Sequence, residues 1–125
     1  MMKTYKDLEI YQESLHLFYR IHALSLRLPK YELYELGSQI RRSSESVNSN
    51  IVEGYGRRFY KSDFIRFLII AHSSGLETLT HIDKLKHLYP MFGEDYNELY
   101  YAYDKLNAKI FKFIQYVKTS WKTRA

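Results

Sequence analysis

Apolar residues recur at the 3.6-residue spacing of an α-helix in four stretches of the chain. These stretches span approximately residues 8–28, 33–57, 62–87 and 95–121. Pro29 ends the first, because proline cannot continue the hydrogen-bond ladder, and Pro90 with Gly93 breaks the chain before the last. No alternating strand pattern competes with them. The sequence therefore predicts an all-α fold, an antiparallel up-down-up-down four-helix bundle, formed by a single domain over residues 1–125.

Polar residues at two of the predicted helix starts are suited to capping. Asp7 precedes the first helix and is predicted to be its N-cap. Ser62 is predicted to cap the third helix. The carboxylate of Asp63 would then lie in the first turn of that helix, where it complements the positive end of the helix dipole.

The third predicted helix is apolar on two sides. Its main stripe is expected to face the core and contains Phe64, Phe67, Ala71, Ser74, Thr78, Ile82 and Leu85. Ile65, Ile69 and Leu76 form a second ridge on the far side, which a small bundle cannot cover by itself. A monomer that exposed this ridge would be prone to aggregate. We therefore predict a homo-oligomer with these three residues at the subunit interface, to which Phe111 of the fourth helix can add.

A stripe of mostly uncharged polar residues runs along the second predicted helix and continues on the third. We call it the polar stripe, and it consists of Gln39, Ser43, Ser46, Asn50, Glu53, Ser73 and Glu77. Two interpretations stay open: a surface for function or assembly, or close helix packing in which hydroxyls bond to the helix's own carbonyls. The carboxylates of Glu53 and Glu77 suit a structural ion pair or hydrogen-bond network, with Arg42 as one candidate partner.

The chain carries a formal net charge of +5, which favours anionic partners such as nucleic acid. Arg57, Arg58 and Lys61 gather at the end of the second predicted helix. Compensation of the helix dipole is one explanation for this cluster, and contact with phosphates is the other. The nucleic-acid-binding set predicted from the sequence is Arg41, Arg42, Arg57, Arg58, Lys61 and Arg66.

Most catalytic and metal chemistry finds no support in the sequence. The chain contains no cysteine, which excludes disulfides, thiolate metal sites and cysteine nucleophiles. Glu13 and His16 have the spacing of a di-iron motif, but they lie off the core stripe and we interpret the pair as coincidence. We expect no enzyme activity, cofactor or metal. The opening residues lack a signal-peptide core and no segment is long enough to span a membrane, which favours a cytoplasmic location.

The residues of the second predicted helix and its approach resemble a known family. The pattern consists of Pro29, Glu32, Tyr34, Leu36, Gln39-Ile40-Arg41-Arg42, Ser43, Ser46-Val47, Ser49-Asn50-Ile51 and Glu53-Gly54. Further matches are Tyr5, Asp7-Leu8 and Tyr11-Gln12 near the start and Ala71, Ser74, Glu77 and Thr80 in the third helix. Nearly the whole chain resembles the four-helix-bundle proteins associated with intervening sequences in 23S ribosomal RNA genes, also called S23 ribosomal proteins. Ser73 and Gly75 depart from the family pattern, which commonly has a glycine and a larger apolar residue there.

The resemblance implies a homopentameric ring with a central channel and a link to ribosomal RNA that rests on gene location. A related bundle family serves diversity-generating retroelements, where a basic pentamer works alongside a reverse transcriptase and its RNA. The leading hypothesis is therefore a non-enzymatic oligomer that binds structured RNA, such as ribosomal RNA, through phosphate contacts. The rival hypothesis is an assembly scaffold or accessory factor that docks a protein partner, for example a reverse transcriptase, without binding RNA directly.

Overall fold

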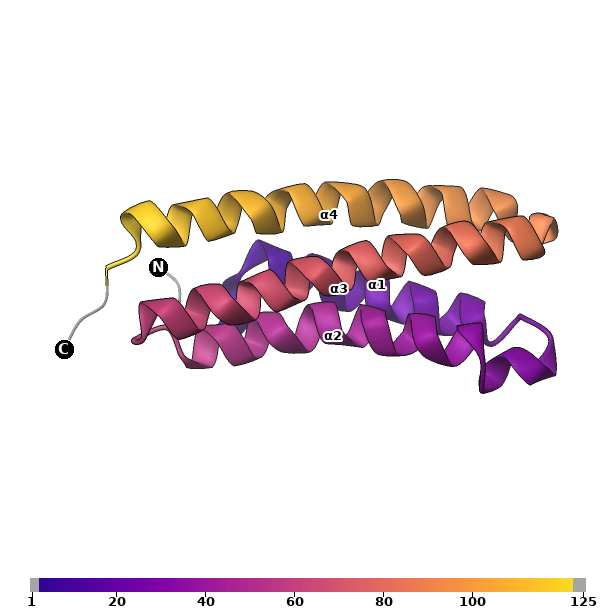
Figure 1. Cartoon of the computed structure of the whole chain (residues 1–125), viewed down its shortest axis with the longest axis horizontal. Helices are drawn as coiled ribbons and strands as arrows, with labels where there is room; N and C mark the ends of the chain where they lie inside the picture. The colour runs from indigo at the N-terminus through magenta and orange to yellow at the C-terminus, as the bar shows by residue number, and fades with distance from the viewer. Residues whose placement is uncertain (1–2, 123–125) are drawn as a thin grey trace.

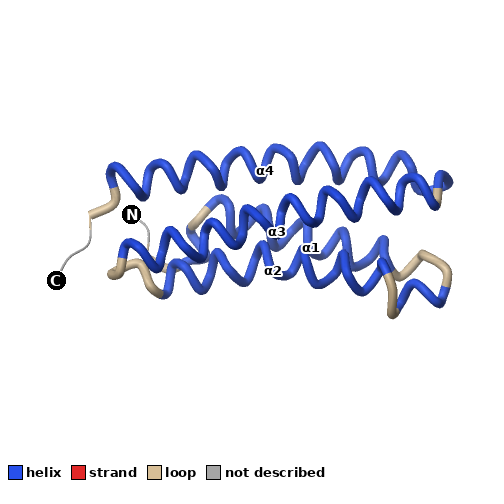
Figure 2. The backbone as a smooth tube through the Cα atoms, in the orientation of Figure 1, coloured by secondary structure: helices blue, strands red, loops and turns tan. Residues whose placement is uncertain are grey.

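The computed structural model describes residues 3–122, which form four long helices and, within that range, no strand (Figures 1 and 2). The long helices are α1 (Glu9–Ser25), α2 (Leu36–Gly56), α3 (Lys61–Leu88) and α4 (Gly93–Ser120). Three short 3-10 helices lie between or before them: η1 (Tyr5–Asp7), η2 (Lys30–Leu33) and η3 (Pro90–Phe92). The predicted all-α architecture is confirmed.

The chain reverses direction after each long helix. The η2 and η3 connections lie at one end of the bundle, and the α2–α3 turn lies at the other, where α1 begins and α4 ends (Figure 1). Side-chain hydrogen bonds join α2 to α3, the next helix along the chain. Thr78 of α3 bonds to Ser43 of α2, and Ser74 of α3 bonds to Ser46 of α2. Each helix therefore packs beside its neighbours in sequence, and α4 closes the bundle against α1.

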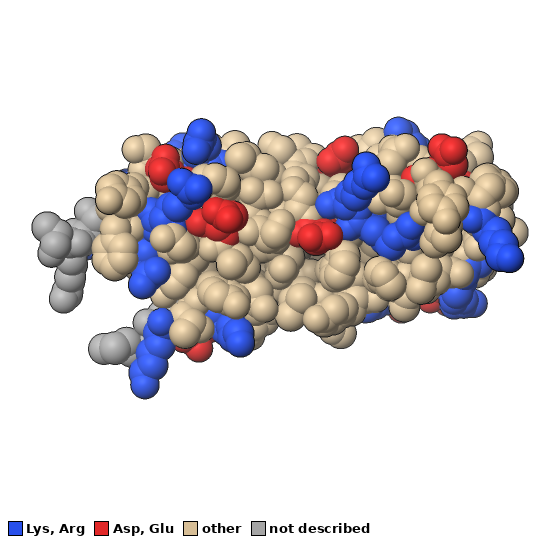
Figure 3. Space-filling model, turned by 90° about the horizontal axis from the view of Figure 1, so that it is seen from below, with Lys and Arg blue, Asp and Glu red and all other residues tan. Residues whose placement is uncertain are grey.

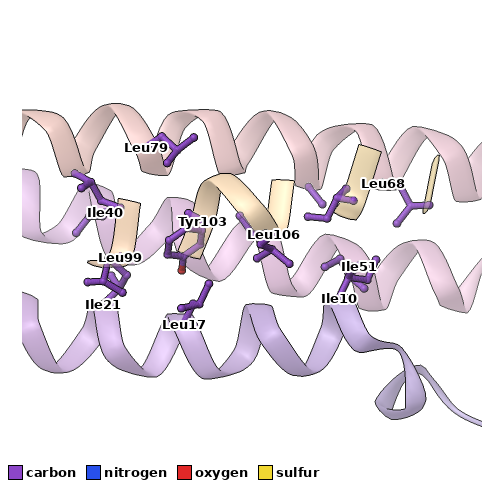
Figure 4. Packing of buried hydrophobic residues seen from close by; sticks show 14 of the residues in the cluster. Ile10, Leu17, Ile21, Ile40, Ile51, Leu68, Leu79, Leu99, Tyr103 and Leu106 are labelled. Carbon is purple, nitrogen blue, oxygen red and sulfur yellow. The ribbon is translucent and has the colours of Figure 1, made fainter. Parts of the chain in front are cut away.

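Side chains from all four helices meet along the axis of the bundle (Figure 4). The predicted apolar stripes supply them, and the largest fully buried residues include Ile21, Ile40, Ile51, Phe64, Leu68, Ile82, Tyr96, Tyr103 and Ile110. Burial of each such side chain contributes roughly 1.5–3 kcal/mol to folding. The core thus fixes which helix faces remain available to partners.

The connection between the first two long helices differs from its prediction. The first helix ends at Ser25 instead of near residue 28, and the second begins at Leu36 instead of near residue 33. The Leu28 amide bonds to the Ser25 carbonyl, three residues earlier instead of the four that an α-helix uses, and Pro29 is the N-cap of η2. Leu33 consequently lies outside α2 and is 39% exposed.

Both predicted helix caps are wrong. Asp7 accepts hydrogen bonds from the amides of Lys3 and Thr4, so it completes a capping box on η1, and Leu8 stands at the start of α1. These amide bonds lower the pKa of the Asp7 carboxyl. Ser62 lies inside the first turn of α3, where Tyr60 occupies the cap position without a side-chain hydrogen bond. The dipole argument for Asp63 stands, because it lies in that first turn.

The start of α2 receives its capping carboxylate from outside the helix. Glu32 in η2 is only 3% exposed, and its carboxylate accepts hydrogen bonds from the Leu36 amide and the Tyr89 hydroxyl. The Tyr31 hydroxyl lies 2.7 Å from that of Tyr89. Hydrogen bonding to Glu32 is the main cause that raises the pKa of Tyr89 far above the usual tyrosine range. Glu32 therefore ties η2, α2 and the end of α3 together.

Candidate nucleic-acid interface

Basic and aromatic side chains gather at the end of the bundle that holds the α2–α3 turn, which we call the basic pole. The turn is short because the amides of Arg57, Arg58 and Tyr60 bond to carbonyls three residues earlier. It places Arg58 at the end of α2 close to Lys61 at the start of α3. The end of α4 packs against both, since Trp121 Nε1 donates to the Arg58 carbonyl and Lys61 Nζ to that of Lys118.

Arg57 is largely neutralised by its own surroundings. Its guanidinium lies 3.4 Å from the carboxylate of Glu53 and 3.6 Å from that of Asp63. It also stacks over the Phe67 ring, 4.7 Å from the centroid, and Arg66 approaches the same ring at 5.2 Å. Arg57 therefore contributes less free positive charge to the basic pole than its position suggests.

Arg58 and Lys61 keep their positive charge available. Among residues 3–122, neither forms an ion pair with a carboxylate. The Arg58 guanidinium lies over the rings of Tyr55, at 4.2 Å, and Phe59, at 4.9 Å, and donates to the Tyr55 carbonyl. Phe59 and Tyr60 are 56% and 72% exposed beside it. Positive charge next to exposed rings is the arrangement with which proteins hold phosphates and stack bases.

The structure divides the six predicted nucleic-acid-binding residues into two groups. Arg57, Arg58, Lys61 and Arg66 lie near the basic pole, whereas Arg41 and Arg42 lie in the first turns of α2. The α-helical rise of 1.5 Å per residue separates Arg42 from Arg57 by about 22 Å. Lysine and arginine likewise form two groups, one in either half of the face in Figure 3, with a stretch between them that lacks both.

Arg41 is engaged within the bundle. Its guanidinium donates to the Ser25 hydroxyl at 2.9 Å and to the Leu33 carbonyl at 2.6 Å. These bonds hold the end of α1 and the η2 connection against α2. Arg42 is exposed on the outer side of the same helix. The geometry gives Arg41 a structural role, so it is not part of the basic pole.

The polar stripe is partly buried between α2 and α3. Thr78 donates to the Ser43 hydroxyl at 2.8 Å, and the hydroxyls of Ser46 and Ser74 lie 2.8 Å apart. The Asn50 amide donates to the carbonyl and the hydroxyl of Ser46, both at 2.9 Å. The remaining members are exposed, and they are Gln39, Glu53, Ser73 and Glu77. The middle of the stripe therefore binds the two helices together, while its edges face outward.

The two carboxylates of the polar stripe do not use Arg42 as a partner. Glu53 pairs with Arg57, and a Glu77 oxygen lies 3.8 Å from Nε2 of His81. Their side chains are 58% and 62% exposed, so such pairs add little to stability. Both carboxylates are open to solvent, unlike the enclosed carboxylates that serve as catalytic groups.

His81 makes the fold sensitive to acid. Its side chain is 6% exposed, and burial lowers the pKa of the imidazole below 6.5, an effect that Glu77 partly offsets. Below pH 6.5 the unfolded chain therefore takes up a proton before the folded chain does, so stability is lost as the pH falls. The expected loss is at most about 1.4 kcal/mol per pH unit. Urea unfolding at pH 7.5, 6.5 and 5.5 measures it, and His81→Gln should flatten the dependence; an equally steep dependence in that variant would contradict the assignment.

A family model for the 23S rRNA-intervening sequence protein matches residues 6–112. The chain belongs to this family. Its fold is also similar to that of a protein of unknown function from the S23 ribosomal protein family of Bacteroides thetaiotaomicron VPI-5482. The two share 25% sequence identity with a TM-score of 0.77 over 85% of this chain and 98% of the other. Comparison with curated proteins yields no match. Neither finding names a reaction.

Gly75 lies where α3 packs closely against α4. A Cβ atom at this position would overlap the side chain of Asn107 in α4. The Asn107 amide donates to the His72 carbonyl at 3.1 Å and so bridges α4 to α3. Gly75 therefore permits a polar contact between these two helices that a larger residue would block.

The predicted oligomer ridge lies along the outer seam of α3 and α4. Ile65 is half-buried against the core, whereas Ile69 and Leu76 are 47% and 52% exposed. Phe111 of α4, 53% exposed, lies beside them with its ring 6.1 Å from that of His72. We call Ile69, Leu76 and Phe111 the α3/α4 patch. A shallow hollow next to it is lined by His72, Leu76, Asp104, Asn107, Ala108, Phe111 and Lys112.

Several features of this family member were not anticipated from its sequence. The exposed rings of Phe59 and Tyr60 carried no periodic signal, although their position beside Arg58 in a turn was a clue. The Glu13 carboxylate lies 2.6 Å from Lys109 Nζ across the α1/α4 seam, a pairing that the sequence did not predict. Within residues 3–122 no three histidine or acidic side chains are placed to hold a metal ion. None of the helices in the same range is long and apolar enough to cross a membrane.

Proposed function

We propose that this protein binds structured RNA through the basic pole, as a homopentameric ring of up-down-up-down bundles without enzymatic activity. The observation that carries the proposal is the positive charge of Arg58 and Lys61, which form no ion pair with a carboxylate among residues 3–122, next to the exposed rings of Phe59 and Tyr60. Arg and Lys bind phosphates regardless of sequence, and aromatic rings stack on unpaired bases. A hairpin with an unpaired loop offers both groups.

The α3/α4 patch supports assembly into a ring. A cyclic oligomer needs two different surfaces that fit each other, because each subunit contacts its neighbours head to tail. Ile69, Leu76 and Phe111 supply one apolar surface, and Tyr19 of α1 and Leu26 just after it, which are 60% and 55% exposed, supply a second. Because the subunits of a ring are related by rotation about one axis, the basic poles of all subunits face the same side of the ring. One RNA then contacts several poles, which raises its affinity through avidity.

Loss of the two available charges of the basic pole is expected to weaken RNA binding. In the double variant Arg58→Ala/Lys61→Ala, affinity for a labelled ribosomal RNA hairpin should fall about tenfold or more, because two phosphate contacts per subunit are lost. The dependence of log K on log salt should become shallower by about 2 for each pole engaged. Fluorescence anisotropy across a salt series measures both quantities, and an equal-length DNA duplex tests the preference for RNA.

The control is Arg41→Ala/Arg42→Ala, which removes the same charge from the other half of α2. The control is expected to bind RNA with nearly unchanged affinity, although loss of the Arg41 bonds will lower its melting temperature. Equal RNA affinity for the wild type and the Arg58→Ala/Lys61→Ala variant would remove the basic pole as the binding site. Absence of RNA binding by the wild type at low salt would end the RNA proposal altogether.

A scaffold or accessory factor that docks a protein partner is the second candidate function. Its supporting observation is the exposed edge of the polar stripe on α3, where Ser73 and Glu77 lie near Ile70, which is 40% exposed. Small polar groups around an apolar side chain suit contact with another protein, such as a reverse transcriptase. The salt series distinguishes the two candidates, since a scaffold of this kind would bind neither the hairpin nor the duplex while keeping its oligomeric mass.

A further inference from the structure

A groove of about 440 Å³ runs between α1 and α4 and belongs to none of the surfaces considered above. Its lining consists of Gln12, Glu13, His16, Leu17, Arg20, Tyr101, Ala102, Lys105, Leu106 and Lys109. Leu17 and Leu106 are buried and make an apolar floor. The small side chain of Ala102 leaves space above that floor. The volume falls within the range of about 300–1,000 Å³ that is usual for small-molecule sites.

The polar groups around this groove are mainly cationic. Arg20, Lys105 and Lys109 line it, against the single carboxylate of Glu13. Lys109 Nζ lies 2.6 Å from carboxylate oxygens of both Glu13 and Glu9, so its charge is already compensated. These interactions raise the pKa of the Lys109 ammonium to about 12. The Arg20 guanidinium is compensated as well, by Glu98 at 3.2 Å, so Lys105 carries most of the uncompensated charge of the groove.

Lys105 and Arg20 offer hydrogen-bond donors to an anion. Lys105 is exposed and forms no ion pair with a carboxylate in the part of the chain that the structure describes. Its ammonium lies 5.3 Å from the centroid of the Tyr101 ring. Arg20 uses one terminal nitrogen for Glu98 at 3.2 Å, which leaves its other N–H groups for a ligand. An uncompensated ammonium thus lies beside an aromatic ring at the edge of an apolar floor.

We propose that the α1/α4 groove binds one unpaired nucleotide, with its base on the apolar floor beside Tyr101 and its phosphate at Lys105. Tyr101 is 66% exposed, so its ring is open to stacking. Gln12 and His16 carry polar atoms that suit the hydrogen-bonding edge of a base. A purely apolar ligand would leave the Lys105 ammonium without a partner, and a bare phosphate would leave the floor exposed to water.

This inference rests on the proposed RNA function and adds a second contact point to it. Lys105 and Lys118 are thirteen residues apart on α4, so the α-helical rise places the groove about 20 Å from the basic pole. The pole would hold the phosphates of a structured RNA, and the groove would hold a base that is not paired. Binding of this kind favours RNA with a loop or bulge over a continuous duplex.

Titration of the full-length protein with adenosine monophosphate tests the groove directly. Amide shifts followed by NMR should map to α1 and α4, with adenosine and inorganic phosphate each binding at least fivefold more weakly. Tyr101→Ala and Lys105→Ala should each weaken binding of adenosine monophosphate at least fivefold. Both side chains are exposed, so the variants should fold normally. Tyr34→Ala and Lys84→Ala, at exposed positions outside the groove, are the matched controls and should bind as the wild type does.

Three results separate this inference from the proposed function. Adenosine monophosphate binding that survives Arg58→Ala/Lys61→Ala supports a groove distinct from the basic pole. Binding of adenosine monophosphate in a protein that binds no RNA keeps the groove and removes the RNA function. The groove proposal is overturned if millimolar adenosine monophosphate shifts no amide of α1 and α4. It is also overturned if the wild type, Tyr101→Ala and Lys105→Ala bind the nucleotide equally well. In both cases RNA binding through the basic pole is unaffected.

Discussion

Glu32→Ala should lower the free energy of unfolding by about 3 kcal/mol, because it removes the acceptor of the part-buried Leu36 amide and of the buried Tyr89 hydroxyl. The Leu36 amide begins α2, and the Tyr89 hydroxyl is enclosed where α3 ends. Each lost acceptor costs roughly 1–3 kcal/mol when no water can replace it. For a chain of 125 residues this corresponds to a fall in melting temperature of about 10 °C. Chemical denaturation followed by circular dichroism measures the free energy.

Two neighbouring substitutions separate the carboxylate from general effects of mutation in this segment. Glu32→Gln keeps an acceptor oxygen of similar shape and should lose less than half as much stability as Glu32→Ala. Glu35→Ala removes an exposed carboxylate three residues later and should change stability by less than about 0.5 kcal/mol. If Glu32→Ala were as stable as Glu35→Ala, water would be reaching the donors and the capping role would be lost.

The helices and the core could be predicted from sequence because helical periodicity is a local property. In a bundle of this size the stripe of Ile40, Val47 and Ile51 can be buried only against the core, and all three residues are fully buried. The helix ends were harder, since a cap depends on which of several nearby acceptors reaches the free amides. Asp7 was available to either η1 or α1, and only the three-dimensional path of the chain decides between them.

The candidate sites were predicted only in part because charge in a sequence does not reveal its partners. Arg57 and Arg58 are adjacent, yet Arg57 is compensated by Glu53 and Asp63 while Arg58 lies on aromatic rings. The sequence does not distinguish Arg41 from these two arginines, yet its hydrogen bonds hold the η2 connection against α2. Which side chains pair across two helices depends on the register between those helices. The hydrophobic periodicity of each helix does not determine that register.

The α1/α4 groove could not be predicted from the sequence either, because its lining comes from residues far apart along the chain. Glu13 and Lys109 are separated by 96 positions, so nothing local connects them. The groove lies where α1 and α4 face each other, and the small side chain of Ala102 helps to leave it open. The space left between two helices follows from how they pack, which the periodicity of each helix does not determine.

Leu76→Asp is expected to convert the proposed ring into monomers of 15.1 kDa, the largest change in mass available from a single substitution. Leu76 lies in the α3/α4 patch and is 52% exposed in the isolated subunit, so an aspartate there still reaches water when the subunit is alone. In a ring the same carboxylate would be buried against an apolar neighbour, which costs several kcal/mol at every interface. Light scattering coupled to size-exclusion chromatography measures the mass directly.

Leu88→Asp is the matched control, since Leu88 ends α3 at 53% exposure but lies outside the α3/α4 patch. It should keep the wild-type mass, and both variants should retain the helical circular dichroism signal of the folded bundle. A wild type that already runs as a monomer, or a Leu76→Asp variant with unchanged mass, would contradict assembly through this patch. If the mass falls as expected, RNA affinity should fall with it although the basic pole is intact, because a monomer offers one pole where a ring offers several.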